Sequence, residues 1–202
     1  FKGADSDLHS GVFGGAVPNP AFELCKLVAQ LKDDQGRIMV PGFYDKVIDL
    51  SDQERQDYAR LPFDQEAFRS ELNVPGLSGE VGWTPLEQRS ARPTLEINGM
   101  LSGWTGPGAK TVLPSKAMVK ISCRLVPNQD PEEIAQLLAD HIKKLAPDTV
   151  ECTVLSLHGG KPWVTPRQHP ALDCANKAVQ AVFGEQALFV REGGSIPIVV
   201  DF

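Results

Sequence analysis

The sequence predicts an α+β fold, namely a four-stranded, mostly antiparallel sheet with two helices on one face, followed by a partial α/β segment. Two amphipathic helical patterns, at residues 20–31 and 131–145, and one strictly alternating strand pattern, at 116–126, carry this prediction. With the shorter apolar segments they follow the order strand, helix, strand, strand, helix, strand. This order is typical of a ferredoxin-like split βαβ unit.

The first part of the pattern is the end of a strand, a loop and a helix. Residues 1–6 are compatible with a strand end, and the glycine-rich segment 7–15 is expected to be a loop. Asn19 is expected to cap the helix with Pro20 at its first position, and residues 33–36 end it. The apolar stripe of this helix has helical spacing and comprises Ala21, Leu24, Cys25, Val28 and Leu31.

Residues 37–92 are less regular and are expected to form an arm inserted into the fold. Ser51 and Glu54 form a capping box for a short helix that reaches about residue 60. Asp64 is expected to open another helix that reaches about residue 72. Frequent Pro and Gly between residues 75 and 85 predict loops.

Two strands follow the arm. Residues 94–98 alternate as a strand, and the glycine-rich segment 99–114 is expected to be a loop. The clearest strand of the chain is 116–126, because its apolar and polar residues alternate strictly. One face is formed by Ala117, Val119, Ile121, Cys123 and Leu125; the other carries Lys116, Lys120, Ser122 and Arg124.

The last elements of the unit are a helix and a strand. Asp130 is expected to cap a helix that Pro147 terminates, and residues 150–157 are expected to form the final strand. The apolar face of this helix comprises Ile134, Leu137, Leu138, Ile142 and Leu145.

A second region is expected from residue 158 onward. Residues after His169 form a helical pattern that ends at Gly184, a residue type that favours helix C-termini. A short strand at 188–190, a loop at 192–195 and a further helix are expected after it. The organisation is therefore a first domain at 1–157, with its arm at 37–92, and a segment of another domain at 158–202.

Composition limits the function classes. The 202 residues carry a net charge of −6 and no cluster of Lys and Arg with interleaved aromatic residues, which argues against nucleic-acid binding. The apolar run 196–200 is far shorter than the roughly 20 residues that span a membrane, and no signal peptide is visible. The four cysteines are widely spaced and are expected to be buried, reduced thiols, which favours a cytoplasmic location.

No metal-binding motif is apparent. The four histidines include no pair at i,i+4 spacing and no His-x-Asp, and the cysteines do not cluster with them. Glu132 and Glu133 stand at a helix start, where carboxylates cap the helix and compensate its dipole. We therefore expect no metal ligands from this chain.

Three sets of residues are candidates for binding chemistry. His9 lies among small residues in a loop, where an imidazole can approach a ligand or simply be solvated. Arg124 stands on the polar face of the clearest strand, which suits capture of a carboxylate but also fits an ordinary surface arginine. The segment Glu192 to Ser195 offers free amides before an apolar helix, a possible site for an anion or a substrate terminus.

Five segments, in this order, closely resemble the M20 metallopeptidases, in particular the carnosinase-like dipeptidases related to cytosolic nonspecific dipeptidase. They are DLHSGVFGG at 7–15, GPGAKTVLP at 106–114, RLVPN at 124–128, HGGKPW at 158–163 and REGGSIP at 191–197. The resemblance spans nearly the whole chain.

The resemblance implies a hydrolase of short peptides with two divalent metal ions, zinc or manganese, and a homodimer formed through a lid domain. The lid of this family is a four-stranded sheet with two helices on one face, which agrees with the predicted fold. Residues 1–157 then correspond to the lid and residues 158–202 to the return into the catalytic domain. The family's metal ligands have no counterpart here and are expected in flanking sequence, so this chain alone is expected to be inactive.

The resemblance also implies roles for individual residues. His9 corresponds to a histidine that reaches the partner subunit's active site and stabilises the oxyanion of the tetrahedral intermediate. Thr111 corresponds to a residue that contacts substrate across the dimer, and Arg124 to the arginine that holds the substrate's C-terminal carboxylate. The positions matching the substrate pocket on the catalytic side are His158, Glu192 and Ser195.

Two alternatives from other classes stay open. The chain could be a non-catalytic dimerisation module, or a ferredoxin-like domain that binds a small molecule. We expect it to be part of a longer protein, because it stops within an apolar run whereas natural domains usually end in polar tails.

Overall fold

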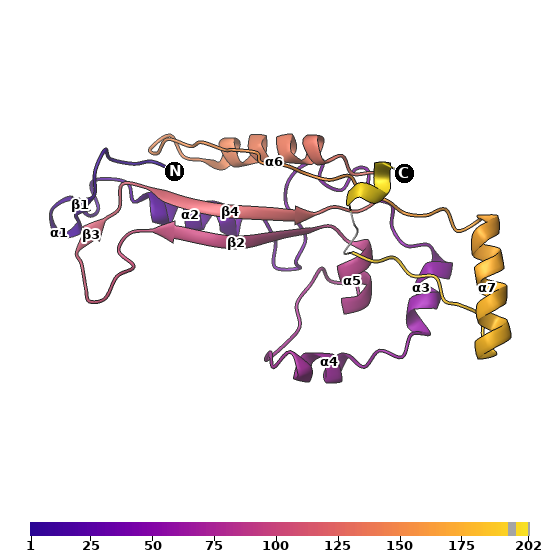
Figure 1. The fold of residues 1–202 in the computed structure, drawn as a ribbon. Coiled ribbons are helices and arrows are strands. Elements are labelled where there is room, and N and C mark those ends of the chain that lie inside the picture. The colour runs from indigo at the N-terminus through magenta and orange to yellow at the C-terminus, as the bar shows by residue number, and fades with distance from the viewer. Residues whose placement is uncertain (194–196, 202) are drawn as a thin grey trace. The chain divides into compact units, whose positions relative to one another are not determined.

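A computed structural model describes residues 1–193 and 197–201 (Figure 1). The chain divides into two compact units. The first unit comprises Phe1–Asp45, Thr94–Arg124 and Pro131–Gly159, and the second comprises Lys46–Pro93, Leu125–Asp130 and Gly160–Phe202. The chain therefore leaves the first unit and returns to it twice.

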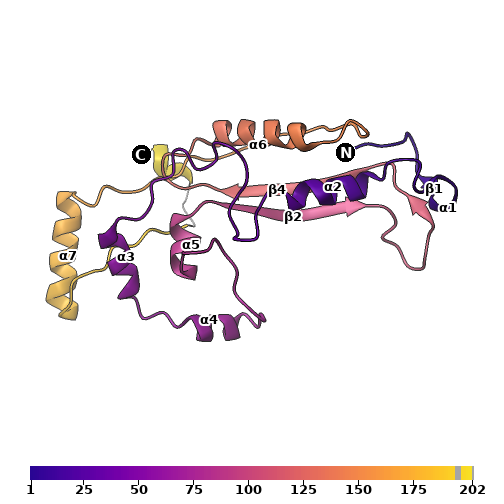
Figure 2. The same cartoon turned by 180° about the vertical axis from the view of Figure 1, so that it is seen from behind.

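Helix α2, Pro20–Ala29, provides one apolar face of the first unit and lies against strand β4 (Figure 2). Asn19 caps it as predicted, because its Oδ1 accepts a hydrogen bond of 3.0 Å from the amide of Ala21. The predicted stripe is partly wrong: Leu24, Leu27 and Leu31 are buried, whereas Cys25 is exposed. The buried side follows i, i+3, i+7 spacing, and Cys25 lies at its margin.

Helix α6, Pro131–Leu145, is the second long helix of this unit, and it confirms the prediction. Glu132 and Glu133 lie in its first turn, and two lysines lie in its last turn, which suits the helix dipole at both ends. Ile134 and Ile142 are its buried residues. Both belong to the apolar face that the periodicity predicted.

Strands β2, Thr94–Ser102, and β4, Ala117–Arg124, form an antiparallel pair. The predicted alternation of β4 is confirmed, since less exposed and more exposed residues alternate along its whole length. Strand β2 is longer than predicted because an irregularity in register between Ile97 and Gly99 lets pairing continue beyond the glycine.

The described residues do not form one continuous four-stranded sheet. Strand β1, Leu8–His9, pairs only with β3, Val112–Leu113, as a separate antiparallel sheet. Lys2 forms isolated antiparallel bridges with both Lys116 and Glu151, so the predicted outer strands are reduced to short bridges. The antiparallel α+β class is confirmed, but the expected sheet is only partly formed.

The predicted strand at 150–157 is wrong apart from the bridge at Glu151. Val150 is buried, but Leu155 and Leu157 are among the most exposed apolar side chains of the described residues. An alternation of apolar and polar residues does not by itself produce a strand where the apolar side chains have no surface to pack against.

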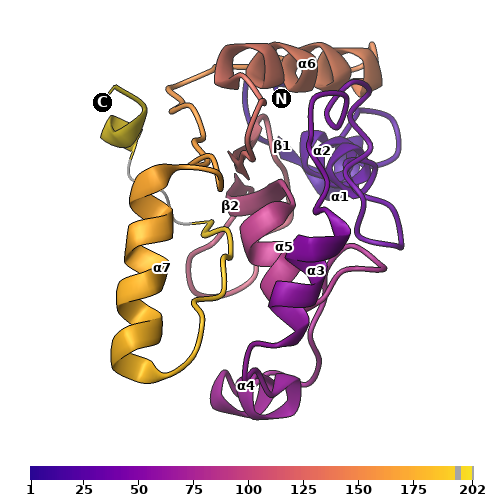
Figure 3. The same cartoon turned by 90° about the vertical axis from the view of Figure 1, so that its right-hand side faces the viewer.

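The arm is more regular than the sequence indicated (Figure 3). It contains α3, Asp52–Ala59, α4, Gln65–Glu71, and α5, Pro85–Ala91. The caps predicted at Ser51 and Asp64 are confirmed. Helix α5 was missed, although Thr84 and Glu87 form a capping box and Pro85 occupies the first helical position.

The second unit has its own small core around Leu50, Tyr58 and Ala91. Next to it, the buried guanidinium of Arg92 binds both carboxylate oxygens of Glu80, with distances of 3.0 and 2.7 Å. The guanidinium groups of Arg92 and Arg55 lie 4.4 and 4.3 Å from the Trp83 ring centroid. A bidentate ion pair and cation–π contacts thus stabilise the arm where apolar residues are few.

Helix α7, Pro170–Phe183, forms as predicted and ends at Gly184, which has a left-handed φ of 79°. None of its residues is buried, and Phe183 is 76% exposed. The strand predicted at 188–190 is absent, and Pro197–Asp201 is a 3-10 helix, η1. In the described part of the chain, no helix has the length and apolarity that crossing a membrane requires.

Leu27→Ala tests the core of the first unit. Leu27 is only 2% exposed, so we expect the change to lower the free energy of unfolding by about 2–5 kcal/mol, through lost burial and a residual cavity. The matched control is Leu157→Ala at a side chain that is 88% exposed, where we expect almost no change. Urea unfolding followed by circular dichroism measures both, and equal effects would contradict the assigned core.

Candidate functional site

The β1–β3 ladder brings His9 and Thr111 together although 102 positions separate them in the sequence. His9 pairs with Val112 in the ladder, and the amide of Ser10 donates to the carbonyl of Thr111 at 3.2 Å. As a result, Nε2 of His9 lies 3.1 Å from the Thr111 hydroxyl oxygen. Two of the predicted site residues therefore form one exposed pair.

The other nitrogen of His9 is also engaged. The amide of Gly11 donates to Nδ1 of His9 at 3.0 Å, so that His9 caps the short helix α1, Ser10–Phe13. The segment 7–15, predicted to be a loop, therefore contains one helical turn. The imidazole is exposed to solvent and held in position at both of its nitrogens.

Asp7 anchors this arrangement and was missed by the sequence reasoning. Its Oδ1 accepts hydrogen bonds from the amide and the hydroxyl of Ser115, at 2.8 and 2.9 Å. These bonds, with a smaller contribution from Lys110, hold the pKa of the Asp7 carboxyl below its ordinary value. The position of Asp7 in the sequence could have indicated such a role, because a short polar side chain directly before a strand often forms hydrogen bonds with nearby backbone groups.

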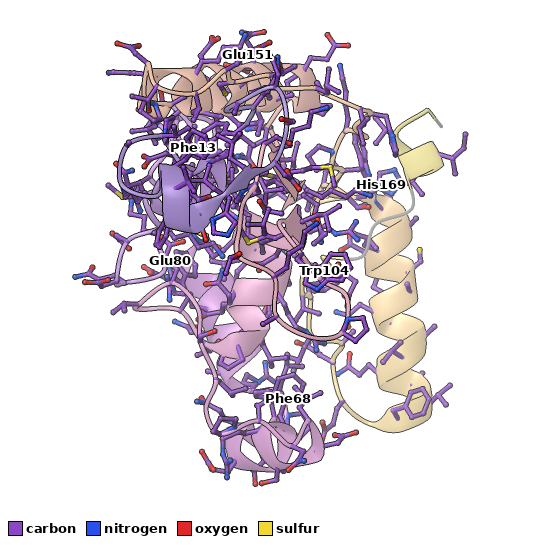
Figure 4. All side chains as sticks on the ribbon, turned by 90° about the vertical axis from the view of Figure 1, so that its left-hand side faces the viewer. Phe13, Phe68, Glu80, Trp104, Glu151 and His169 are labelled. Atoms are coloured by element: carbon purple, nitrogen blue, oxygen red, sulfur yellow. The ribbon has the colours of Figure 1, made fainter. Side chains whose placement is uncertain are left out.

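Exposed apolar side chains accompany the pair. Val12 and Phe13 on α1 are exposed, and so is Trp104 in the loop between β2 and β3. Phe13 and Trp104 are labelled in Figure 4. The ammonium of Lys110 lies 5.1 Å from the Trp104 ring centroid. Apolar residues beside exposed hydrogen-bonding groups are typical of surfaces that contact a partner or a ligand.

Arg124 lies at the opposite end of the first unit. It is the last residue of β4 and pairs with Thr94 in the ladder, and its side chain forms no hydrogen bond or ion pair with another described residue. The β1–β3 sheet lies beyond the other end of β4 (Figures 1 and 2). Seven residue steps at about 3.3 Å each put roughly 23 Å between the two ends of this strand.

The length of β4 determines whether His9 and Arg124 of one copy can contact the same small ligand. A dipeptide extends at most about 7 Å, at 3.3–3.6 Å per residue. His9 and Arg124 of the same copy therefore do not reach the same dipeptide, even allowing for the length of both side chains. The structure brings His9 and Thr111 together and keeps Arg124 apart.

The remaining predicted residues lie elsewhere. His158 is exposed near the end of the first unit's last segment, and Glu192 is exposed in the second unit. Neither side chain has a hydrogen bond or ion pair with another described residue. Ser195 lies outside the described residues.

Arg191, directly before Glu192, is a positioning residue that the sequence reasoning did not single out. Its guanidinium binds both carboxylate oxygens of Glu54, at 2.9 and 3.1 Å, and its amide donates to the Tyr58 hydroxyl at 3.0 Å. Burial opposes ionisation of Glu54, but bonds from Arg191 and Ser51 outweigh it and lower the pKa of this carboxyl. The arm thereby fixes the backbone that leads to Glu192.

The described side chains do not fit a metal ion. Among them, no group of three or more His, Cys, Asp or Glu residues is arranged to hold one. Two shallow cavities, of about 370 and 400 Å³, are lined by 15–19 with parts of α2 and by 77–85 with Gln65 and Gln88. Neither cavity includes a predicted site residue, so the His9–Thr111 pair lies on an open surface.

Comparison with known proteins gives consistent matches. The family model of the M20 peptidase dimerisation domain matches residues 2–150. The Cys-Gly metallodipeptidase dug1 of Schizosaccharomyces pombe is 34% identical over the whole chain, which covers 43% of that protein. The human Beta-Ala-His dipeptidase is 31% identical over the whole chain, which covers 40% of it.

A solved structure is similar as well. The M20 family metallo-carboxypeptidase Sso-CP2 from Sulfolobus solfataricus superposes with a TM-score of 0.83 and 29% identity. That match covers 98% of this chain and 51% of the other. The chain thus spans less than half the length of the curated relatives given above.

Asp7→Ala tests the anchor of the β1–β3 sheet. We expect hydrogen exchange at the Ser115 and Ser10 amides to become severalfold faster, because the carboxylate that ties β1 to the segment after β3 is lost. Asp5→Ala is the control, since Asp5 is exposed and its only ion pair with a described residue is with Lys2. Unchanged exchange at Ser115 in the Asp7 variant would exclude this anchoring role.

In the unaltered protein the same protection should depend on pH. The folded-state pKa of Asp7 is lowered, so its contribution is fully present above the unfolded value of about 3.9 and is lost as the pH falls through the lower, folded value. Protection of the Ser115 amide that persisted well below that range would show that the carboxylate does not hold it.

Proposed function

Because the chain belongs to the M20 family of peptidase dimerisation domains, we propose that it is the dimerisation lid, with an adjoining segment, of a metal-dependent dipeptidase or exopeptidase that hydrolyses short peptides. Its support is the family match together with relatives whose names are metallodipeptidase and dipeptidase. Residues 1–157 are proposed as the lid, with the arm at 37–92, and residues 158–202 as part of the catalytic domain.

The proposed enzyme uses two divalent metal ions, zinc or manganese, held by residues other than those described here. The relatives support a metal-dependent class, and the described side chains do not fit such ions. A cytoplasmic location belongs to the same proposal, because all four cysteines are free thiols and disulfides are rare in the cytoplasm.

The chain's own residues bind and orient the substrate. In the proposal, His9 stabilises an oxygen of the substrate at which negative charge develops, an interaction of about 3–4 kcal/mol in a water-excluded site, and Thr111 contacts the substrate. Arg124 binds the substrate's C-terminal carboxylate, which its unpaired guanidinium suits. His158, Glu192 and Ser195 are proposed as further contacts to the peptide.

One observation carries this assignment. Arg124 is the last residue of β4, and the sheet that contains His9 lies beyond the first residue of this strand, whose length is roughly 23 Å; both side chains are exposed. If both contact one dipeptide, they must come from two copies of the chain. The roles therefore require a homodimer in which each copy lends its His9–Thr111 pair to the site that contains the other copy's Arg124.

The edge of the β2–β4 pair supports a dimer formed through the lid. Among described residues, β2 pairs only with β4, so its other edge offers nine residues of unpaired backbone. Met100 and Leu101 on this strand are exposed apolar residues. An exposed edge of this length is a template for pairing with another chain.

Mixing two variants, each impaired at dipeptide concentrations well below KM, tests the shared site. In the proposed enzyme, His9→Ala should lower kcat about 10²–10³-fold, and Arg124→Ala should chiefly raise KM for dipeptides. Random exchange of protomers gives about half heterodimers, each with one intact site in two, so mixing should restore about a quarter of the original activity. Activity is measured by dipeptide hydrolysis after exchange of the subunits.

The controls are each variant mixed with itself, which should show no recovery. Failure of the mixed sample to recover activity, although sedimentation shows heterodimers, would place His9 and Arg124 in one copy or remove one of them from the site. A dimer that neither binds nor hydrolyses dipeptides would favour the non-catalytic module instead.

The isolated 202-residue chain should not hydrolyse dipeptides when zinc or manganese ions are added. The expected reason is that the described residues provide no cluster that holds the metal and activates water. An assay of released amino acids measures this, with an M20 dipeptidase as the positive control. Turnover that is lost in His9→Ala would contradict the prediction.

A further inference from the structure

The hydrogen-bond partners of His9 determine which ring nitrogen carries the proton. A backbone amide can only donate, so the 3.0 Å bond from Gly11 requires an unprotonated Nδ1. The proton of the neutral imidazole must therefore be on Nε2. At the 3.1 Å contact between Nε2 and Thr111, the imidazole is then the donor and the hydroxyl oxygen the acceptor.

This direction leaves the hydroxyl hydrogen of Thr111 available. A hydroxyl has one hydrogen to donate, and Thr111 Oγ1 has no other partner among the described residues. Accepting a bond from Nε2 polarises the Thr111 O–H group and makes it a stronger donor. The pair thus presents a polarised hydroxyl to solvent.

Glycine at position 11 is required by space. A Cβ atom there would lie 2.9 Å from Cε1 and 3.1 Å from Nδ1 of His9, closer than the ring tolerates. The φ angle of Gly11 is outside the left-handed region, so its backbone conformation alone does not call for glycine. An alanine would push the imidazole out of its two contacts and leave the backbone in place, because the atoms that its Cβ meets belong to a rotatable side chain.

We propose that Gly11 is a positioning residue that fixes His9 as the Nε2–H tautomer, and that Thr111 delivers the resulting hydrogen bond to an acceptor oxygen of the ligand. The part about the ligand rests on the proposed function, whereas the tautomer follows from the geometry alone. The ligand group that this pair would bind is a single hydrogen-bond acceptor with negative charge. The Thr111 hydroxyl contacts it directly, and His9 acts through its hydrogen bond to Thr111.

Nitrogen-15 spectra of the histidine rings in the 202-residue chain, above pH 8, test the tautomer. We expect His9 to show a protonated Nε2 and an unprotonated Nδ1, and Gly11→Ala to shift it to the tautomer mixture of a solvated histidine. His169 is an internal reference, because the amide of Ala171 binds its Nδ1 at 3.2 Å in the same way. His9→Gln assigns the signals.

Gly76→Ala is the matched control, since a Cβ there meets no atom within 4 Å. Its His9 signals should equal those of the original chain. A predominant Nδ1–H tautomer at His9, or identical His9 spectra for the original chain and Gly11→Ala, would overturn the inference, with circular dichroism showing that the variants are folded.

Activity of the proposed enzyme tests the part played by Thr111. Thr111→Val keeps the shape but removes the hydroxyl, so we expect kcat to fall about 10²-fold with little change in KM, and Thr111→Ser to restore most of it. An unaffected kcat would remove Thr111 from ligand binding while leaving the tautomer result intact. If the NMR spectra show the Nε2–H tautomer but mixing the His9 and Arg124 variants restores no activity, the proposed function is rejected and the tautomer inference stands.

Discussion

The pairing of β2 with β4 is the constraint on which the arrangement of the candidate site depends. Its antiparallel ladder keeps eight residues of β4 extended, with Arg124 at one end and the β1–β3 sheet beyond the other. An extended backbone in a paired strand has little freedom to shorten, so the ladder keeps Arg124 and the β1–β3 sheet apart. If both His9 and Arg124 act on one substrate, the site must therefore be built from two copies of the chain.

Elements with long periodic patterns were predictable from the sequence. Helices α2 and α6 and strand β4 have enough residues for one face to be distinguished from the other, and burial follows that distinction. Elements that need a partner from elsewhere were not predictable. The segment 150–157 alternates like a strand, yet its outer leucines meet no described apolar surface, and only Glu151 forms a bridge.

The arm shows another limit of pattern reading. Its helices are short and polar, so apolar periodicity carries little information, and Pro and Gly suggested loops. Its stability comes instead from caps, the pair of Arg92 with Glu80 and the contacts of two guanidinium groups with Trp83. At the site, the motif indicated His9 and Thr111, but the identity of Ser115 as the partner of Asp7, 108 positions away, and the contact with Gly11 required coordinates.

The distribution of the cysteines gives the molecule natural attachment points for spectroscopic probes. Cys25 on α2 and Cys174 on α7 are exposed, and they lie in different units, whereas burial raises the pKa of the Cys123 thiol to about 11. A thiolate is the species that reacts with maleimides, so Cys123 reacts slowly with them at neutral pH. A pair of dyes or spin labels on Cys25 and Cys174 therefore places one probe in each unit.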